Sequence, residues 1–452
     1  MKKTFSNIIL VFICSCLFFC NSIAQNIYAF AGTGVFGYSG DGAAAVSAKL
    51  AGPIRIAVDA SGNVFVTENF NHCVRKINTS GVISTIAGTG VSGFSGDGGL
   101  ATLAQLYSPG GITLDAGGNI YISDTGNQRI RKINTSGIIS TIAGVGTIGF
   151  SGDGGTATLA QFSGPSGIAL DISGNIYCAD YNNHRIRKIN TSGVISTIAG
   201  TGTAGFFGDG GPATSAQIMS PLDVTTDASG NIYIADGGND RIRKINATGT
   251  ITTIAGNGFA AYFGDGGAAT SAGLFNPSGV ELDASGNVYI ADKYNNCIRK
   301  VNTSGIISTI GGNSIAGNAG DGGLATLAQM NQPSNLAIDA LGNIYVTDYT
   351  NQRVRIICST NCPVGTDINS LSENTSIKTG VYPNPAKDLL QIANEQNLFE
   401  NSEIEITNTL GQLIFKLPYK SPIDVSKLSP GFYNLKIISQ NKQFYYSKFI
   451  KE

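Results

Sequence analysis

Residues 165–200 decide the fold and read PSGIALDISGNIYCADYNNHRIRKINTSGVISTIAG. Four short runs with the composition of β-strands lie in this stretch, at 168–170, 175–179, 185–189 and 194–198. The segments between them contain Asp, Asn, Ser and Gly, in which Asp or Asn bonds nearby backbone and Gly accepts a positive φ. Helical periodicity is absent, so the stretch predicts four antiparallel strands joined by tight turns.

The same unit recurs along the chain with a fixed period. A Gly-Asp-Gly triplet and a later Gly-Asn pair both repeat in steps of 56 residues, and the triplet is centred on Asp41, Asp97, Asp153, Asp209, Asp265 and Asp321. A constant period without insertions is typical of a repeat architecture. Six units of four strands each predict an all-β fold, a six-bladed β-propeller.

The two ends of the repeat region complement each other. Residues 27–32 align with the fourth strand of a unit, for example with residues 83–88, whereas the sixth unit, 333–358, contains only three strands. We therefore expect the N-terminal strand to complete the last blade. The propeller would then span residues 25–358 and leave no open sheet edge.

The motif of each unit resembles that of a known family. Gly-Asn-Ile-Tyr-Ile-x-Asp followed by Asn-x-Arg-Ile-Arg-Lys-Ile is similar to the NHL repeat, and the resemblance covers all six units. It implies a six-bladed propeller whose rim binds proteins and sometimes RNA. A few relatives of this class are metal-dependent lyases or lactonases, which keeps an enzyme as the alternative.

Both ends of the chain predict export. Residues 1–24 have a short basic start, an apolar run and small residues before Gln25, the pattern of a cleaved signal peptide. Residues 359–376 are polar and predict a linker. Residues 377–452 contain short strand-like runs that predict a small β-sandwich.

This tail resembles the C-terminal sorting domain of the type IX secretion system. The shared motifs are Tyr-Pro-Asn-Pro, Leu-Gly-Gln, Leu-Ser-Pro-Gly-Phe-Tyr and a terminal Lys-Phe-Ile-Lys. The resemblance implies that the type IX machinery carries the protein across the outer membrane of a Gram-negative bacterium. We expect it to be secreted or attached to the outer cell surface, with no integral membrane segment once the signal is removed.

Composition argues against a nucleic-acid partner. The 452 residues carry a formal net charge of -1, and charged residues make up only 13% of them. The basic positions of each unit are matched by acidic ones, so the chain has no general positive field for nucleic acid. We therefore expect no nucleic-acid ligand, and we expect ion pairs within or between blades.

Repeated carboxylates are the first candidate site. The loop between the second and third strands should share a face with the connection to the next blade, which brings together Asp97, Asp124, Asp153 and Asp180. Oxygen ligands of this kind suit calcium or a polar ligand. A feature repeated in six blades more often serves the fold, with each Asp bonding its own loop, so we expect no cofactor, with calcium as the alternative.

Departures from the repeat are the better guide to a unique site. Two positions after the Pro that opens each unit, the six blades have Arg55, Gly111, Gly167, Asp223, Gly279 and Asn335, and Glu281 stands two positions further on in the fifth blade. These residues belong to the first strand, which lines the central channel of a propeller. Arg55, Asp223, Glu281 and Asn335 are therefore predicted to form a polar ligand-binding channel mouth, or else a solvated entrance.

Few residues suggest catalysis. His72 and His184 are the only two histidines, which does not reproduce the multi-histidine zinc site of the lyase relatives. Cys358 and Cys362 are close enough to pair, and the redox state of Cys73, Cys178 and Cys297 stays open. We expect an exported, non-catalytic propeller that presents loops to a protein or glycan. The alternative is an extracellular metal-dependent lyase or hydrolase at the channel mouth.

Overall fold

A computed structural model describes residues 25–358, 362, 381–382, 385–392, 402–408, 413–418, 422–438 and 444–452. The chain forms two compact units, Met1–Ile368 and Asn369–Glu452. The predicted signal peptide, 1–24, and all of the predicted linker except Cys362 lie outside the described residues.

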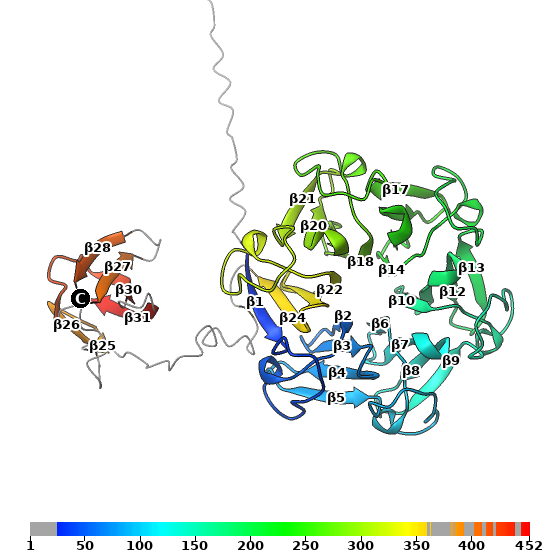
Figure 1. The fold of residues 1–452 in the computed structure, drawn as a ribbon, viewed down its shortest axis with the longest axis horizontal. Coiled ribbons are helices and arrows are strands. Elements are labelled where there is room, and N and C mark those ends of the chain that lie inside the picture. The colour runs from blue at the N-terminus through cyan, green and yellow to red at the C-terminus, as the bar shows by residue number, and fades with distance from the viewer. Residues whose placement is uncertain are drawn as a thin grey trace, which may run out of the picture. The chain divides into compact units, whose positions relative to one another are not determined.

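The first unit consists of six four-stranded antiparallel sheets arranged around a common centre (Figure 1). Blade 1 contains β2 (Pro53–Val58), β3 (Val64–Glu68), β4 (Cys73–Ile77) and β5 (Ile83–Ala87). Blade 2 contains β6 (Ile112–Leu114), β7 (Ile120–Asp124), β8 (Arg129–Ile133) and β9 (Ile139–Ala143). Blade 3 contains β10 (Pro165–Leu170), β11 (Ile176–Asp180), β12 (Arg185–Ile189) and β13 (Ile195–Ala199).

The remaining three sheets follow the same order. Blade 4 contains β14 (Asp223–Thr226), β15 (Ile232–Asp236), β16 (Arg241–Ile245) and β17 (Ile251–Ala255). Blade 5 contains β18 (Pro277–Leu282), β19 (Val288–Asp292), β20 (Cys297–Val301) and β21 (Ile307–Gly311). Blade 6 contains β22 (Pro333–Ile338), β23 (Ile344–Asp348), β24 (Arg353–Cys358) and, from the other end of the chain, β1 (Asn26–Ala31).

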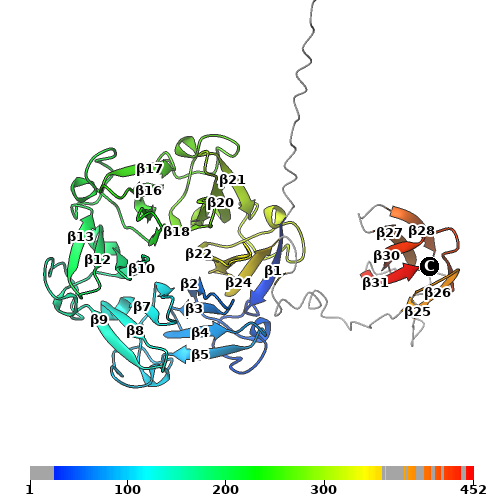
Figure 2. The same cartoon turned by 180° about the vertical axis from the view of Figure 1, so that it is seen from behind.

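The N-terminal strand takes its place as the alignment of residues 27–32 predicts. Strand β1 pairs antiparallel with β24, with Asn26 opposite Cys358 and Tyr28 opposite Ile356. Figure 2 shows the same sheet, with β1 beside β24, from behind. At the inner end of this blade, Ser334 Oγ donates a 2.9 Å hydrogen bond to Ile54 O of blade 1.

The hydrophobic core lies between neighbouring blades. Alternate residues of each strand face the next sheet, so that Tyr177 and Ile186 of blade 3 pack with Val224, Ile232 and Ile234 of blade 4. Each blade therefore buries its apolar face only when the next blade is present, which is why a single unit does not suffice for a core. Among the described residues the helical segments are single 3-10 turns, such as η4 (Ala157–Leu159).

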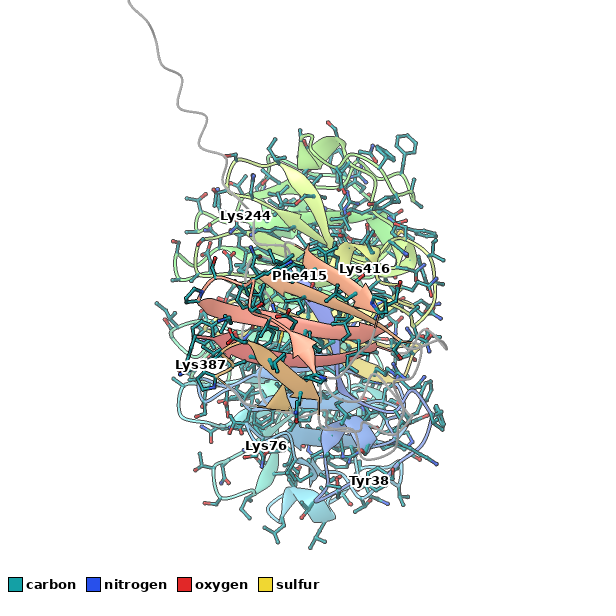
Figure 3. All side chains as sticks on the ribbon, turned by 90° about the vertical axis from the view of Figure 1, so that its left-hand side faces the viewer. Tyr38, Lys76, Lys244, Lys387, Phe415 and Lys416 are labelled. Atoms are coloured by element: carbon teal, nitrogen blue, oxygen red, sulfur yellow. A yellow bond between two sulfur atoms is a disulfide. The ribbon has the colours of Figure 1, made fainter. Side chains whose placement is uncertain are left out.

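Two kinds of loop meet on one face of the propeller, which we call the loop face. Asn127, in the loop between β7 and β8, donates from Nδ2 to Gly93 O in the connection that precedes blade 2. Figure 3 views the propeller edge-on: Tyr38, in the connection after β1, lies toward one face, and Lys76 and Lys244 lie toward the other. The prediction that these loops share a face therefore agrees with the hydrogen bonding.

The second unit contains two small sheets. One has the order β25 (Val381–Tyr382), β26 (Leu389–Ile392), β29 (Ile423–Asp424), and the other has the order β28 (Leu413–Pro418), β27 (Glu403–Asn408), β30 (Gly431–Ile438), β31 (Phe444–Lys451). Leu390 of the first sheet and Ile404, Leu435 and Phe449 of the second belong to one buried cluster. Phe415 and Lys416, labelled in Figure 3, lie on β28, where Lys416 Nζ pairs with Glu403 Oε2 at 3.0 Å.

Within the described ranges, no helix has the length and apolar character that a bilayer span requires.

Candidate functional site

The first strands of the six blades enclose a cavity of about 310 Å³ on the propeller axis. Each of these strands, β2, β6, β10, β14, β18 and β22, ends its sheet, so one edge of its backbone faces the axis. Residues near the start of the strands are buried, whereas Val58, Leu170, Leu282 and Ile338 at their ends are half-exposed. The cavity is therefore closed toward the loop face and open toward the opposite face.

Arg55 closes the cavity. Its side chain is only 4% exposed and crosses the axis from blade 1. Nη1 donates to Ser278 O at 2.6 Å and to Ser334 O at 3.0 Å, and Nη2 donates to Leu222 O at 2.5 Å and to Ser166 Oγ at 3.4 Å. One guanidinium thus joins blade 1 to blades 3, 4, 5 and 6, using the fixed fork of donors that only Arg provides.

Asp223 and Asn335 complete this polar plug. Asp223 Oδ2 lies 3.9 Å from Arg55 Nη1 and accepts hydrogen bonds from Asn335 Nδ2 at 2.8 Å and from Val280 N at 3.1 Å. Asn335 Oδ1 in turn accepts from Ile56 N. Burial raises the pKa of Asp223, and the charge of Arg55 opposes that shift. Asp223 and Asn335 therefore link blades through hydrogen bonds, and Asp223 also offsets the positive charge of Arg55.

Glycine occupies the corresponding position in blades 2, 3 and 5 for a steric reason. A Cβ at Gly111 would meet Ser166 O, and one at Gly167 would meet the side chain of Asp223. Backbone takes the place of side chains here: Gly111 N donates to Ser166 O at 3.2 Å and Gly167 N to Leu222 O at 2.9 Å. The three glycines leave the space on the axis that Arg55 fills.

Glu281 lies deeper in the cavity wall. Its Oε1 accepts from Leu282 N at 2.9 Å and from Thr225 Oγ1 at 3.3 Å. The cavity wall half-buries this side chain, and its partial desolvation, reinforced by the charge of Asp223, raises the pKa of Glu281 to about 7. The structure therefore brings all four predicted residues to the axis, but Arg55, Asp223 and Asn335 form a buried plug rather than a solvated entrance.

The predicted loop carboxylates meet, but an arginine lies between them in each blade. Arg131 Nη2 lies 2.7 Å from Asp97 Oδ1 and its Nη1 lies 3.1 Å from Asp124 Oδ2. Arg187 joins Asp153 and Asp180 in the same way, at 2.9 and 3.2 Å. The equivalent arginines Arg75, Arg243, Arg299 and Arg355 are likewise fully buried. Calcium at these loops would have to displace a guanidinium from its two carboxylates.

The inner carboxylate of each pair also shapes its loop. Asp124 Oδ1 accepts from Tyr107 N at 2.8 Å, and its Oδ2 accepts from Asn127 Nδ2 at 2.8 Å. Burial raises the pKa of Asp124, while these donors and Arg131 act in the opposite direction. Such an arrangement holds the loop and the connection together, which is a structural task.

The two histidines serve as links between blades. His72 Nδ1 accepts from Ser108 N and His184 Nδ1 accepts from Ser220 N, at 3.1 and 3.0 Å. Burial lowers the pKa of each. Across the part of the chain that the structure describes, no group of three or more His, Cys, Asp or Glu is placed to hold a metal ion. Cys73, Cys178 and Cys297 are buried free thiols, and Cys358 forms a disulfide with Cys362.

A row of five rings and one lysine on the loop face was not predicted from the sequence. We call it the aromatic arc; it consists of Phe36, Phe70, Tyr349, Lys293, Tyr294 and Phe275. Its signal was present in the repeat, because the positions of Phe70 and Tyr294 hold Gly126, Asn182 and Gly238 in blades 2–4. A comparison of every position at the 56-residue step, rather than of the first strand alone, would have found it.

The repeat region matches known family models along its length. Residues 20–95, 90–149, 146–205, 203–262 and 258–318 match the model described as the Teneurin NHL domain, and residues 330–357 match the NHL repeat. The chain belongs to the NHL-repeat family. The predicted resemblance is thereby confirmed, and the NHL propeller accounts for the six sheets described above.

Curated relatives of the NHL propeller are much longer proteins. Mouse teneurin-4 is 28% identical over 350 residues, which cover 68% of this chain but 12% of teneurin-4. The SUPPRESSOR OF QUENCHING 1 protein of Arabidopsis thaliana, which is chloroplastic, is 29% identical over 264 residues, 55% of this chain and 25% of that protein. The chain thus spans about an eighth to a quarter of the length of these two relatives.

Solved structures share the fold of the NHL propeller. A protein of unknown function from Bacteroides thetaiotaomicron has a TM-score of 0.56 at 19% identity, with 74% of this chain and 76% of that chain covered. An auxiliary nutrient binding protein from the same organism has a TM-score of 0.53 at 16% identity, with the same coverage. At these identities the likeness concerns the fold alone.

The tail of the NHL protein has its own match. Residues 380–452 match the model described as the secretion system C-terminal sorting domain. This domain indicates export through the type IX system to the cell surface or beyond it, as the tail motifs predicted.

Proposed function

We propose that this protein is an exported, non-catalytic NHL propeller that binds a protein or glycan at the outer surface of a Gram-negative bacterium or outside the cell. The loop face is the binding surface. Residues 1–24 act as a cleaved signal peptide, 25–358 form the closed propeller, 359–376 form the linker, and 377–452 form the sorting domain, a small β-sandwich that engages the type IX machinery.

The aromatic arc is the observation that carries this proposal. Four of its five rings are exposed, with 60% of Phe36, 52% of Phe70, 43% of Tyr294 and 38% of Phe275 accessible to solvent. Exposed aromatic clusters are uncommon on monomeric proteins and are typical of binding surfaces. A ring that served the scaffold would be needed in every blade, whereas none of the four repeat positions that the arc residues occupy is aromatic in all six blades.

The ion pairs and hydrogen bonds that the charged side chains already make support a binding role over a catalytic one. A buried arginine holds the two loop carboxylates of its blade in ion pairs, as Arg131 and Arg187 do. Asp223, which the metal-dependent alternative would use, already accepts from Asn335 and Val280 and lies beside Arg55. A cation at that position would face the repulsion of the guanidinium.

Two measurements test the proposal. The purified full chain should bind outer-membrane or matrix material saturably, and Phe70→Ala should weaken this binding, whereas Phe150→Ala, which removes a ring from blade 3, should not. In cells, truncation after residue 376 should retain the protein inside the envelope. Binding that is equal in all variants would contradict the loop-face assignment, and a truncated protein found outside the cell would contradict the role of the tail.

A further inference from the structure

We propose that the aromatic arc binds a saccharide chain that carries carboxylate groups, with its rings against the sugar faces and Lys293 paired with a carboxylate. This inference rests on the proposed function and names the class of its ligand. The rings form a continuous row, one lysine lies within it, and the loops of the arc present no free strand edge.

The arc is continuous across three neighbouring blades. The ring of Phe36 lies 5.8 Å from that of Phe70, and Phe70 lies 6.4 Å from Tyr349 of blade 6. On the other side, the ring of Phe275 lies 5.0 Å from that of Tyr294 in blade 5. These distances between ring centroids make one surface of the rings rather than separate exposed side chains.

Lys293 joins the two halves of the arc. Its Nζ lies 5.7 Å from the ring centroid of Tyr349 and 5.4 Å from that of Tyr294. Aromatic faces hold an ammonium group in place without neutralising its charge. Equivalent positions in blades 1–4 carry Asn69, Thr125, Tyr181 and Gly237, so the cation is specific to this blade.

The surroundings of Lys293 favour an anion. Within the described ranges, no carboxylate lies within ion-pair distance of its Nζ. The nearby loop acids Glu68, Asp292 and Asp348 are fully buried, each against an arginine at 2.9, 3.2 and 3.5 Å. Burial lowers the pKa of Lys293, and the charge of Arg55 lowers it further. A bound carboxylate would relieve both unfavourable effects.

The geometry disfavours a peptide that binds by adding a strand to a blade. In that mode of recognition the backbone of an extended peptide pairs with a free strand edge. The arc is formed by connections and by loops between second and third strands, and these two strands are both paired on each side, as in β18–β19–β20–β21. What this surface offers is ring faces, phenolic hydroxyls and one ammonium group, which match the C–H faces, hydroxyls and carboxylates of an acidic sugar.

Binding of polygalacturonate, with neutral dextran as the comparison, tests the proposal on the full mature chain. We expect saturable binding of polygalacturonate. Dextran has no carboxylate to pair with Lys293 and could bind only by stacking on the rings, so its binding should be at least about tenfold weaker. Lys293→Gln and Tyr349→Ala should each weaken polygalacturonate binding by about tenfold or more, as losses at an interface centre do. Binding should also weaken as salt rises, since one partner is charged.

The matched control is Lys188→Gln. Lys188 also lies over a tyrosine ring, at 5.5 Å from Tyr177, but belongs to β12 of blade 3, outside the arc. Its binding should equal that of the wild type. Lys293→Arg keeps the charge and should retain most of the affinity, and thermal unfolding of each variant shows whether it is folded.

The possible outcomes separate this inference from the proposed function. If polygalacturonate does not bind, or binds Lys293→Gln and wild type alike, the acidic-saccharide inference is wrong. If the chain instead binds envelope material in a protease-sensitive, Phe70-dependent manner, the partner is a protein and the proposed function stands. If it binds neither polygalacturonate nor envelope or matrix material, both proposals are wrong.

Discussion

Arg55 Nη1 lies 3.9 Å from Asp223 Oδ2, although the two residues belong to blades 1 and 4, on opposite sides of the propeller. Both side chains are almost fully buried. A charge pair that spans the axis can form only when all the blades between them are in place. Formation of the Arg55–Asp223 pair therefore depends on the assembled ring of blades and not on any single blade.

Replacement of the axial arginine should destabilise the propeller as a whole. Arg55→Met removes the donors to Ser278 O, Ser334 O and Leu222 O and leaves Asp223 buried without its cation. We expect a loss of about 3–5 kcal/mol in the free energy of unfolding, measured by urea denaturation. Arg353→Met is the control, because its pair with Asp321 is partly exposed and should contribute about 1 kcal/mol or less. Equal effects of the two variants would contradict the axial role of Arg55.

The glycines of the plug should not tolerate a side chain. A Cβ at Gly111 would overlap Ser166 O, a backbone atom that cannot rotate away. Gly111→Ala should therefore cost about 1–3 kcal/mol of stability, the range of overpacking. Gly99→Ala is the matched control, since its Cβ would meet only Gly96 O, at 3.4 Å. Chemical denaturation of both variants decides the point: a neutral Gly111→Ala would mean that the ring can widen.

The two carboxylates that pair with one arginine should differ in how much they contribute to the free energy of unfolding. Asp180 is fully buried beside Arg187, whereas 38% of the Asp153 side chain is exposed. Asp180→Asn should lower the free energy of unfolding by about 3–5 kcal/mol, because it leaves the buried arginine without its one fully buried counterion. Asp153→Asn should cost about 1 kcal/mol or less. A reversal of this order in thermal or urea unfolding would show that burial does not set the strength of these pairs.

Glu281 should make stability depend on pH. Folding raises the pKa of Glu281 to about 7. Between its ordinary pKa and this value, the carboxyl is therefore protonated in the folded chain but ionised in the unfolded chain. The contribution of a group with a raised pKa is present at low pH and is lost as pH rises through the folded pKa. Between pH 5 and pH 8 the wild type should thus lose about 2–3 kcal/mol relative to Glu281→Gln. If the free energy of unfolding changed equally with pH in the wild type and in Glu281→Gln, the Glu281 carboxyl would be fully hydrated and its pKa would not be raised.

Much of the fold could be predicted from residues 165–200. Strands β11 and β12, Ile176–Asp180 and Arg185–Ile189, lie within a residue of the predicted runs, because Asp, Asn and Gly mark each turn chemically. The position of Ile27 in the last blade also follows from alignment alone. Strand β10 begins at Pro165, earlier than the predicted residue 168, since pairing with β11 extends it.

The candidate site was only partly predictable. The break in symmetry singled out Arg55 and Asp223, and the opposite placement of blades 1 and 4 suggested that they share the channel. That they form a plug depends on the length of the arginine side chain and on the backbone carbonyls it reaches, such as Ser278 O. No motif marks a carbonyl, because every residue has one.

The sequence by itself determined the number of blades, the strand order and the export signature of the tail, because turns and repeats are local patterns. Only the tertiary structure decided what the polar residues do. It placed Arg187 between Asp153 and Asp180, which turned a predicted row of carboxylates into ion pairs. It also gathered Phe70, Lys293 and Tyr349 from three blades into one surface. The physical reason is that ion pairing and exposure depend on neighbours distant in the chain, which are set only when the blades pack around their axis.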